Sequence, residues 1–590
     1  MATAESHLLI GIDFGTTFSG VAWAWSERPD EIFVITNWKS NLSKNSDTSK
    51  VPTTILYKNG LCTWGYDISL EEEPIQWFKL LLVDEADLQD DICACEQVQQ
   101  ARKVLRRHNK SEIDVVADYL RMLWKHSTEE IKKARGKAGV EGLPCRVVIT
   151  IPAIWKPNAQ ERMREAAKRA GILSSPFREA DLQLVYEPEA GALSVLADFQ
   201  ERPDIKPGDV FVVCDAGGGT VDIITYKVMG TDPIMLKEIV EGKGRLCGAI
   251  FPDKEFENFM KMKVRGKTWQ KLSQSSIKSM VNNEWEHGIK RNYDGSDRIF
   301  TVSLPTGWTS GRLFHPLDDR KNDISAAQLS ITGQRIRAIF GKSISGIRGL
   351  VNQQIEEVRK KEKKYPKAIL LVGGFGACGY IQSALAKEHA HEGIEVMHPP
   401  GGKAWSAICR GAVIKAMTNS GIDTNLNVLI SSRISRFNYG HLFMHPFRPG
   451  IDRQDDRIFD QVRGIAMATN QMIWYLKKGD DILDTKPVHF NWALTKDEPL
   501  SDNSFKLPLM HCESIDAPKR WSKEVKPLCD LVIRLQTPFE KLPMISGKDG
   551  KVHREINFEI EMTSTGTSLD FRVFMNGVQV GKSNVLVQYE

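Results

Sequence analysis

The chain has 590 residues, of which 41% are hydrophobic, 26% charged and 8% aromatic, and these ordinary globular values exclude wholesale disorder and fibrous repeats. With 79 Lys and Arg against 75 Asp and Glu, the formal net charge is +4, so no strongly basic surface for nucleic acid or a membrane is indicated. At roughly 100–200 residues per domain, the length is sufficient for several domains.

The sequence gives no signal for export or membrane insertion. The longest apolar runs, such as 368–372, are far shorter than the ~18–20 residues that span a bilayer. The N-terminal segment MATAESHLLIGID lacks a basic region followed by an apolar one. Cysteines in apolar runs, such as Cys145, Cys214 and Cys409, are typical of free buried thiols in a reducing compartment. We therefore predict a cytoplasmic protein with no membrane and no nucleic-acid partner.

Short apolar strands alternate with amphipathic helices over the first two-thirds of the chain. Helices are predicted to start at Ser111 and at Asn158, which is assigned as an N-cap because Glu161 follows three residues later and Gly171 lies past the helix end. This alternation predicts an α/β class with sheets covered on both faces. The predicted strands, each ending in a Gly, Pro or Asp turn, cover 8–13, 146–151, 210–215 and 368–372.

From about residue 420 the helical periodicity stops and short alternating runs appear, which predicts a β-rich domain over 425–590. Near its end, strands are predicted at 556–562 and 568–575, with a turn at 563–567 between them. Asn576-Gly577 after the second strand is a strong hairpin signal. The basic run 359–367 is interpreted as a solvated helix end rather than a nucleic-acid patch.

Two segments far apart in the chain share one form. LLIGIDFGTTFSG and VFVVCDAGGGTVD each place an aspartate, Asp13 or Asp215, at the end of an apolar strand, before a turn of Gly and Thr. Glycine lets the backbone approach a ligand closely, and successive N–H groups and hydroxyls can cradle phosphate oxygens. Two aspartates on opposite sides of one polyphosphate would hold hydrated Mg²⁺ well. The pair predicts two related half-domains that face each other across a cleft.

Other sites considered from the sequence fit less well. The Gly-Lys-Ser/Thr triplets lack the upstream glycine of a Walker P-loop. A G-x-G-x-x-G motif at 374–379 follows a strand, but it lies in mid-chain, after two phosphate-type turns that a dinucleotide fold does not need. Cys93 and Cys95 lack the second Cys or His pair that a zinc site requires.

Three more segments extend the pattern of the two turns. They are VVITIPAIWKPNAQERMREAAKRAGI running into LVYEPEAGALSVL, LLVGGFGACGYIQSAL, and GGKAWSAICRGAVIKA. In order and spacing, over residues 8–416, these five segments resemble the 70-kilodalton heat-shock protein superfamily, within the actin-like ATPase fold. The turns resemble its two phosphate loops, and the other three resemble its first connecting segment, its adenosine loop and its second connecting segment.

The resemblance implies an α/β fold: a duplicated, ribonuclease-H-like, two-lobed actin-like ATPase domain followed by a smaller β-rich C-terminal domain. Lobe I would cover 1–205, lobe II 206–420, and a part similar to the family's substrate domain, without a helical lid, 425–590. The branch is divergent, because the family's acidic-leucine linker is replaced by SGIDTNLNVLISSRI and the chain stops at VLVQYE. Standard peptide capture and co-chaperone docking are therefore not implied.

The resemblance also implies ATP or ADP, Mg²⁺ and a monovalent ion such as K⁺ as cofactors. Lys79 would orient the attacking water, and Asp222 would bind water or the monovalent ion. In this assignment the metal residues, acting through water, are Asp13 and Asp215; the catalytic residues are Lys79, Glu187, Asp215 and Asp222; the nucleotide-binding residues are Gly15, Thr16, Thr17, Gly217, Gly218, Gly219, Thr220, Lys290, Arg291, Gly373, Gly374 and Phe375.

Several of these residues have a simpler interpretation. Lys79 could be a plain surface lysine, Glu187 a helix N-terminal acid favoured by the dipole, and Lys290-Arg291 a solvated helix face. Phe375 stands where the family commonly has Ser. The Glu that the family places three residues before the Lys falls here at His287, with Glu286 next to it.

The implied function is an ATP-binding, slowly ATP-hydrolysing, chaperone-like molecular switch, and thus a weak ATPase, whose partners are protein clients or a single folded protein. The first alternative is a nucleotide-binding adaptor with little or no turnover, which would keep the loops but lose the water orientation at Lys79. The second is a small-molecule kinase of the same fold, which would need a catalytic Asp base facing a sugar pocket.

Overall fold

The computed structural model describes residues 6–40, 48–88, 90–174, 180–199, 204–263, 269, 272–304, 324–325, 328–399, 401–426, 428–483, 487–535, 537–565 and 568–584. It is a mixed α/β structure with several sheets. The chain divides into two compact units, one of Met1–Leu236 with Gly242–Leu429 and one of Lys237–Glu241 with Ile430–Glu590. The final segment VLVQYE, residues 585–590, lies outside the described residues.

The first sheet of the first unit has the strand order β3-β2-β1-β7-β8, with β4 beside β2. Its central strand β1 is buried along its whole length, and it pairs antiparallel with β2 and parallel with β7. A strand covered on both faces needs apolar side chains at every position, which is why it reads as a continuous apolar run. The strands are β1 (Leu8–Phe14), β2 (Phe18–Trp25), β3 (Arg28–Val34), β4 (Val51–Pro52), β7 (Cys145–Ile151) and β8 (Ala180–Tyr186).

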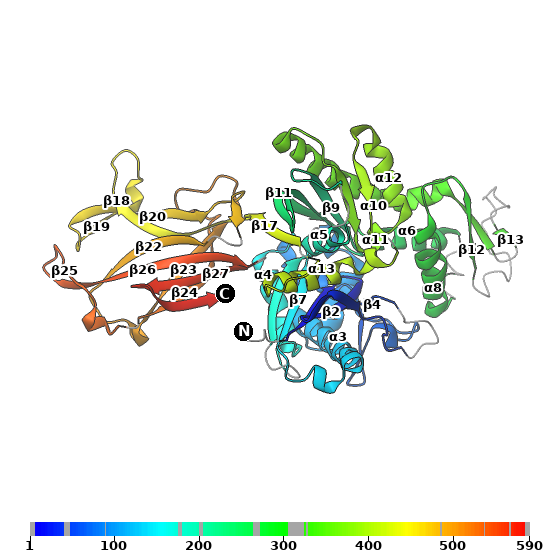
Figure 1. Cartoon of the computed structure of the whole chain (residues 1–590), viewed down its shortest axis with the longest axis horizontal. Coiled ribbons are helices and arrows are strands. Elements are labelled where there is room, and N and C mark those ends of the chain that lie inside the picture. The colour runs from blue at the N-terminus through cyan, green and yellow to red at the C-terminus, as the bar shows by residue number, and fades with distance from the viewer. Residues whose placement is uncertain are drawn as a thin grey trace. The chain divides into compact units, whose positions relative to one another are not determined.

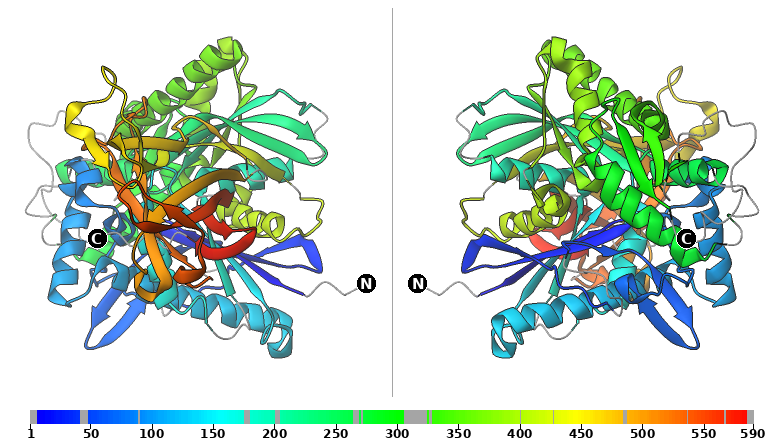
Figure 2. Two further views of the ribbon diagram at one scale, coloured as in Figure 1. Left: turned by 90° about the vertical axis from the view of Figure 1, so that its left-hand side faces the viewer. Right: turned by 90° about the vertical axis from the view of Figure 1, so that its right-hand side faces the viewer.

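The second sheet repeats this local arrangement within the first unit, in the order β16-β15-β9-β10-β11. Its central strand β9 pairs antiparallel with β10 and parallel with β15, and Asp215 lies opposite Asp222 as Asp13 lies opposite Gly20 in the first sheet. In both views of Figure 2, β10 and β11 form a long twisted hairpin. The strands are β9 (Val210–Ala216), β10 (Val221–Thr231), β11 (Ile234–Arg245), β15 (Ala368–Val372) and β16 (Glu395–Met397).

Helices surround both sheets of the first unit (Figure 1). The longer ones are α2 (Glu96–Arg107), α3 (Glu112–Arg135), α4 (Pro157–Arg169), α5 (Glu187–Asp198), α6 (Ile250–Lys263), α10 (Gly333–Glu362), α12 (Gly379–His389) and α13 (Lys403–Asn419). Shorter elements are α1 (Asp90–Cys93), α8 (Gln274–Met280), α9 (Lys290–Asn292), α11 (Gly373–Gly376) and a π-helix over Val281–Ile289. Two small sheets are formed by β5 (Ile55–Lys58) with β6 (Leu61–Trp64), and by β12 (Ile299–Ser303), β13 (Ile324–Ser325) and β14 (Gln328–Thr332). In the described part of the chain, the length and apolarity of the helices fall short of what a membrane crossing requires.

Two predicted helix starts have different outcomes. Ser111 caps α3 as predicted, since its hydroxyl accepts from the backbone of Asp114 in a capping box. The N-cap prediction at Asn158 is wrong, because Lys156 occupies the N-cap position of α4, without a side-chain capping bond, and the helix begins at Pro157. Proline favours the first helical position, because its missing N–H would be unpaired there and its fixed φ fits the helix.

Helix α13 packs against α5, β1, β2 and β7. The structure thus places it with the first sheet, whereas the sequence-based boundary 206–420 assigned it to lobe II. Most residues of the helix are buried, including Ala407, Cys409 and Val413. A helix that is apolar all round must be covered on more than one side, and here β1 and α5 supply those faces.

In the described residues of the second unit, only strands and short 3₁₀ segments occur. Its two larger sheets have the orders β19-β20-β18-β23-β24 and β22-β26-β27-β28, with β25 beside β26. The strands are β17 (Val428–Ile434), β18 (Asn438–Pro446), β19 (Arg457–Asp460), β20 (Ile465–Leu476), β21 (Asp481–Leu483), β22 (Val488–Lys496), β23 (Ser504–Cys512), β24 (Lys526–Arg534), β25 (Met544–Ser546), β26 (Val552–Thr565), β27 (Ser568–Met575) and β28 (Val578–Asn584).

The last hairpins agree with the sequence except at one turn. Asn576 and Gly577 have φ values of 49° and 78°, the left-handed conformation of a two-residue hairpin turn. The predicted turn at 563–567 is wrong at its start, because β26 continues to Thr565, which pairs with Ser568. Thr and Ser were read there as turn formers, but a partner strand supplies the backbone hydrogen bonds that keep them extended. The rest of that turn, 566–567, lies outside the described residues.

A buried histidine in the second unit is expected to make folding depend on pH. His441 on β18 is fully buried and shares a hydrogen bond of 2.6 Å between Nδ1 and the carbonyl oxygen of Pro508. Burial lowers the pKa of His441 to about 4 from its ordinary value of 6.5, although the bond to Pro508 opposes this. The folded state therefore binds a proton at His441 less readily than the unfolded state does.

We expect folding stability to fall between about pH 6.5 and pH 4, by roughly 3 kcal/mol at most for this group. The measurement is urea unfolding of the full chain at several pH values. His441→Asn, which keeps a donor near the Nδ1 position, should flatten the dependence over this range, whereas His391→Asn, at a side chain that is 78% exposed, should not. Equal pH slopes for His441→Asn and the wild type would contradict the expectation.

Candidate functional site

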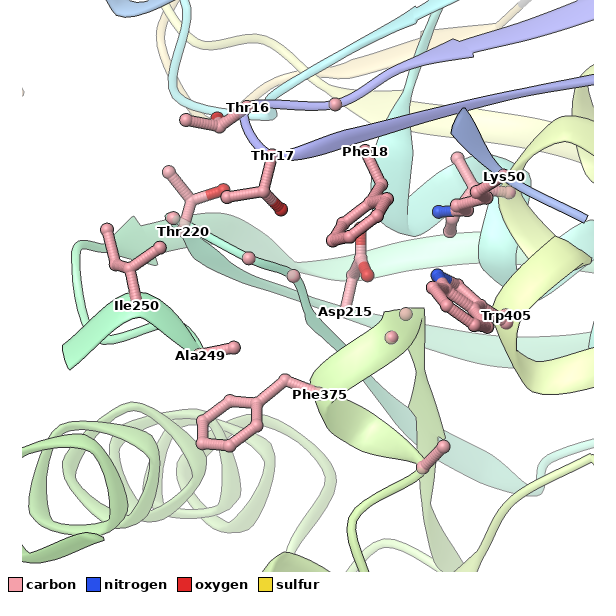
Figure 3. Close-up of a pocket in the computed structure, with 18 of the residues that line it drawn as sticks. Thr16, Thr17, Phe18, Lys50, Asp215, Thr220, Ala249, Ile250, Phe375 and Trp405 are labelled. Carbon is pink, nitrogen blue, oxygen red and sulfur yellow. The ribbon is translucent and has the colours of Figure 1, made fainter. Parts of the chain in front are cut away.

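The two Asp-Gly-Thr turns face each other across one cavity of the first unit, with a volume of about 280 Å³. Figure 3 shows Thr17 and Thr220 approaching from the two turns, with Asp215 and Lys50 further along the cavity. Of the sequence-predicted site residues, the following line it: Asp13, Gly15, Thr16, Thr17, Lys79, Glu187, Asp215, Gly217, Gly218, Gly219, Thr220, Lys290, Arg291, Gly373, Gly374 and Phe375. In the sequence, these residues are spread over more than half of the chain, and the fold brings them together around one cavity.

The glycine-rich turn between β9 and β10 is fixed by its own backbone. The Gly217 N–H donates to the Thr220 carbonyl at 2.9 Å, which closes the turn. The carbonyl oxygens of Gly217, Gly218 and Gly219 accept N–H groups from residues 248–250 at 3.0–3.1 Å. Because these carbonyls are engaged, the turn can present N–H groups to an anion in the cavity.

Glycine is required where the turns come together. A Cβ at Gly218 would lie 1.8 Å from the Thr17 hydroxyl oxygen. Gly373 has a φ of 81°, and a Cβ there would lie 2.3 Å from Asp215 Oδ1. Side chains at either position would fill the space between the phosphate-type turns and the aspartate, so the sequence keeps glycine at both.

Lys79 and Glu187 form a buried ion pair at the cavity wall. Lys79 lies in a 3₁₀ segment, Phe78–Leu82, and its ammonium contacts the carboxylate of Glu187, the first residue of α5. The ammonium also lies 5.7 Å from the ring centroid of Phe14 and 5.4 Å from that of Trp155. Lys79 is 1% exposed, so its interpretation as a surface lysine is wrong. Glu187 is a helix N-terminal acid as well as a cavity residue, so the two interpretations hold together.

The acids of the site disfavour one another's charge. Burial raises the pKa of Asp215 well above its usual range, and the neighbouring Glu187 and Asp13 add to this. Burial and Glu187 likewise raise the pKa of Asp222 to about 7. The buried charged side chains of this region are four carboxylates and two lysines: Asp13, Glu187, Asp215, Asp222, Lys50 and Lys79. The region is therefore short of positive charge, which favours an added cation.

Asp222 lies behind the cavity and is absent from its lining. It is 1% exposed, and its Oδ1 accepts the Ala153 N–H at 3.2 Å. Its other oxygen, Oδ2, is buried with no hydrogen-bond partner among the described residues. An unpaired buried carboxylate oxygen is costly, so this atom is suited to a water or a cation, which fits the role that the resemblance implied.

The residues present fit a metal held through water. Among the described residues, no three His, Cys, Asp or Glu side chains are grouped so that they could hold a metal ion by themselves. Asp13 and Asp215 nevertheless line one cavity from opposite turns, in a region short of positive charge. Two carboxylates with waters and phosphate oxygens make a typical Mg²⁺ site. Cys93 and Cys95 are free cysteines.

At the other end of the cavity, Lys290 is buried rather than on a solvated helix face. Its ammonium lies 2.7 Å from Asp253 Oδ1 and also contacts Glu286. These two acids raise the pKa of Lys290, although its burial opposes the shift. Glu286, and not His287, contacts the lysine from four positions earlier, a spacing that places two side chains on the same face of a helix.

Aromatic residues shape the same end. The Arg291 guanidinium lies 4.6 Å above the ring of Trp405, whose edge meets Phe18 at a centroid distance of 5.8 Å. Phe375 stacks on Phe340 of α10 and is 3% exposed, so its ring fills the core instead of offering a polar group to a ligand. Arg291 and Trp405 thus form a flat surface on which a planar ring can stack.

Further residues that line the cavity were not assigned to the site from the sequence, where Glu286 was noted only as the neighbour of His287: Phe18, Lys50, Ala249, Ile250, Asp253, Glu286, Ala377, Cys378, Gly401, Gly402, Trp405 and Ile408. Phe18 and Trp405 stand inside quoted motifs, so their positions were available as a signal. Lys50 and Asp253 stand in no motif, and only the folded structure brings them to the cavity.

The chain is similar in sequence to several known proteins. No family model matches the chain. The chain is 25% identical to "Heat shock 70 kDa protein 12A" of Mus musculus over 460 residues, which is 64% of this chain and 65% of that protein. It is 24% identical to "Heat shock 70 kDa protein 12B" of Homo sapiens over 528 residues, 76% of this chain and 73% of that protein. It is 32% identical to "Chaperone protein HscA homolog" of Laribacter hongkongensis over 237 residues, 38% of this chain and 32% of that protein.

The fold is mixed α/β, and its two glycine- and threonine-containing turns across one cavity have the backbone chemistry that suits an anion such as phosphate. The matches show, further, that the chain is a distant relative of the 70-kDa heat-shock protein superfamily. The resemblance read from the five sequence motifs is confirmed at this level. The chain spans just under two thirds of the length of the 12A protein that it matches.

Proposed function

We propose that this chain is an ATP-binding, slowly ATP-hydrolysing, chaperone-like switch. Its first unit would be a duplicated, two-lobed actin-like ATPase domain, and residues 425–590 a domain similar to the family's substrate domain. The observation that carries the proposal is that both phosphate-type turns, Asp13, Asp215 and the Lys79–Glu187 pair all line one cavity.

Binding would use each end of the cavity differently. The N–H groups of the two turns and the hydroxyls of Thr16, Thr17 and Thr220 would hold the β- and γ-phosphates of ATP or ADP. Arg291 and Trp405 would stack on the base, and Lys290 would face the nucleoside from its place between Asp253 and Glu286. Mg²⁺, when bound through water near Asp13 and Asp215, would neutralise phosphate charge. K⁺ near Asp222 is a further proposal, supported by its unpaired Oδ2.

Hydrolysis would be attack of water on the γ-phosphorus, in line with the bond to ADP, which breaks as inorganic phosphate forms. Lys79, fixed by Glu187 against the rings of Phe14 and Trp155, would orient the water and face the developing charge. Because the lysine is already held in place, little reorganisation would accompany the reaction.

A nucleotide-binding adaptor with little turnover is the second candidate. It is favoured by the same ion pair, because an ammonium engaged by Glu187 in a buried site has less of its charge available for water and phosphate. The turns and the stacking surface would still bind nucleotide. The two candidates therefore predict the same affinity and different turnover.

Lys79→Met tests the proposal directly. We expect ATP binding to change little and the single-turnover hydrolysis rate to fall by about 10²-fold, because the group that orients water is lost. Lys58→Met, at a side chain that is 59% exposed, is the matched control. Rates are measured by quenched radiolabelled ATP, with and without unfolded peptide. Wild-type binding without turnover would favour the adaptor, and absence of ATP binding would overturn the proposal.

Two further proposals concern the cell. The partners would be protein clients or one folded protein, because relatives carry the names of heat-shock and chaperone proteins. A cytoplasmic location is supported by the ten cysteines, all free in the structure, as expected in a reducing compartment.

A further inference from the structure

Lys50 contributes a second buried ammonium to the phosphate end of the cavity. Its Nζ lies 2.6 Å from Asp13 Oδ2, and the side chains of Lys50 and Asp13 are 7% and 5% exposed. Figure 3 shows this nitrogen pointing into the cavity near Phe18 and Trp405.

The backbone and stem of Lys50 are held in place. Its carbonyl oxygen accepts the Thr48 hydroxyl at 2.6 Å and the Tyr66 hydroxyl at 3.3 Å. The stem passes over Gly20, where a Cβ would lie 3.2 Å from Lys50 Cγ. A lysine fixed in this way has little freedom to leave the aspartate, so it acts as a charge of constant position.

The two lysines serve different acids. Lys79 pairs with Glu187, whereas Lys50 pairs with Asp13, the aspartate expected to face metal and phosphate. Asp13 Oδ1 accepts the Thr150 hydroxyl at 3.4 Å, so both of its oxygens are engaged in the ligand-free site. The charge of Asp13 would therefore already be balanced by Lys50 when a polyphosphate enters this site.

We propose that Lys50 is a positioning residue that acts as a built-in counter-ion to Asp13, so that nucleotide still binds when divalent metal is absent. The inference rests on the proposed nucleotide site and deepens it. Without Lys50, Asp13 would repel the phosphates unless a soluble cation intervened. With Mg²⁺ present, the freed carboxylate would take part in holding the hydrated ion, which would offset the loss.

The test measures the Kd of ADP by calorimetry in EDTA and in excess Mg²⁺, since ADP avoids turnover. We expect Lys50→Met to raise the ratio of the two values about tenfold or more over the wild-type ratio, as expected for loss of one charge-assisted contact. Lys58→Met, an exposed lysine of the same unit, should leave the ratio unchanged. A ratio equal to that of the wild type, including equal loss of both affinities, would overturn the inference.

A double variant guards against misfolding, since removing one partner of a buried ion pair can unfold a protein. Asp13→Asn with Lys50→Met removes one negative and one positive charge, so the net charge of the site is unchanged. Its metal-free Kd should return to within about threefold of the wild-type value, because residue 13 then carries no unpaired charge that repels phosphate. Metal-free binding as weak as in Lys50→Met, or none, would overturn the inference. Failure of wild-type ADP binding with Mg²⁺ would instead refute the proposed function.

Discussion

Gly218→Val is expected to abolish ATP binding, with a loss of affinity of at least ~100-fold, the equivalent of two charge-assisted hydrogen bonds. A Cβ at this position would already lie 1.8 Å from the Thr17 hydroxyl and 2.8 Å from Thr17 Cβ. The two turns must therefore separate, and the N–H groups of one and the hydroxyls of the other can no longer meet the same phosphates. Calorimetry with Mg²⁺ and ATP measures the change.

The matched control for that variant is Gly349→Val in α10, where a Cβ would meet no atom within 4 Å. It carries the same cost of placing a β-branched residue but lies away from the cavity. Thermal unfolding of both variants separates loss of the site from loss of the fold. Unchanged ATP affinity in a folded Gly218→Val protein would show that the two turns do not form the phosphate site.

Asp215→Asn is expected to lower kcat by about 10²-fold or more, with a smaller effect on ATP affinity. The carboxylate faces the place proposed for metal and attacking water, and an amide of the same shape cannot replace its charge. The unliganded fold should tolerate the change, because burial, Glu187 and Asp13 already disfavour a charge on Asp215. Steady-state ATPase and ADP binding are measured on the same preparation.

Glu187→Gln should likewise lower kcat with a smaller effect on ATP affinity. It also removes the ion pair that holds Lys79. Asp181→Asn, at a half-exposed carboxylate on β8, serves as the control with equal loss of charge. A normal kcat in Asp215→Asn would remove that residue from the catalytic assignment. A normal kcat in Glu187→Gln would do the same for the Lys79–Glu187 pair.

Much of the local structure could be read from the sequence because it depends on neighbouring residues. The strand Ala368–Val372 has the same ends in the prediction and in the structure. A short apolar run between turn residues specifies a buried strand by itself. The Ser111 cap and the Asn576-Gly577 turn were equally local, because a capping hydroxyl and a left-handed φ are properties of the residues at those positions. The motifs also named most of the cavity lining.

What the tertiary structure decided is which distant groups meet. Lys50 has no motif, and only the folded chain brings its ammonium to 2.6 Å from Asp13. Glu286, and not His287, is the partner of Lys290; residues three and four positions earlier both neighbour a helical lysine, so spacing alone left this choice open. Helix α13 packs against the first sheet because its apolar surface must be buried on several sides. Local sequence thus determined the turns and strands, whereas the pairing of buried charges depended on contacts between residues far apart in the chain.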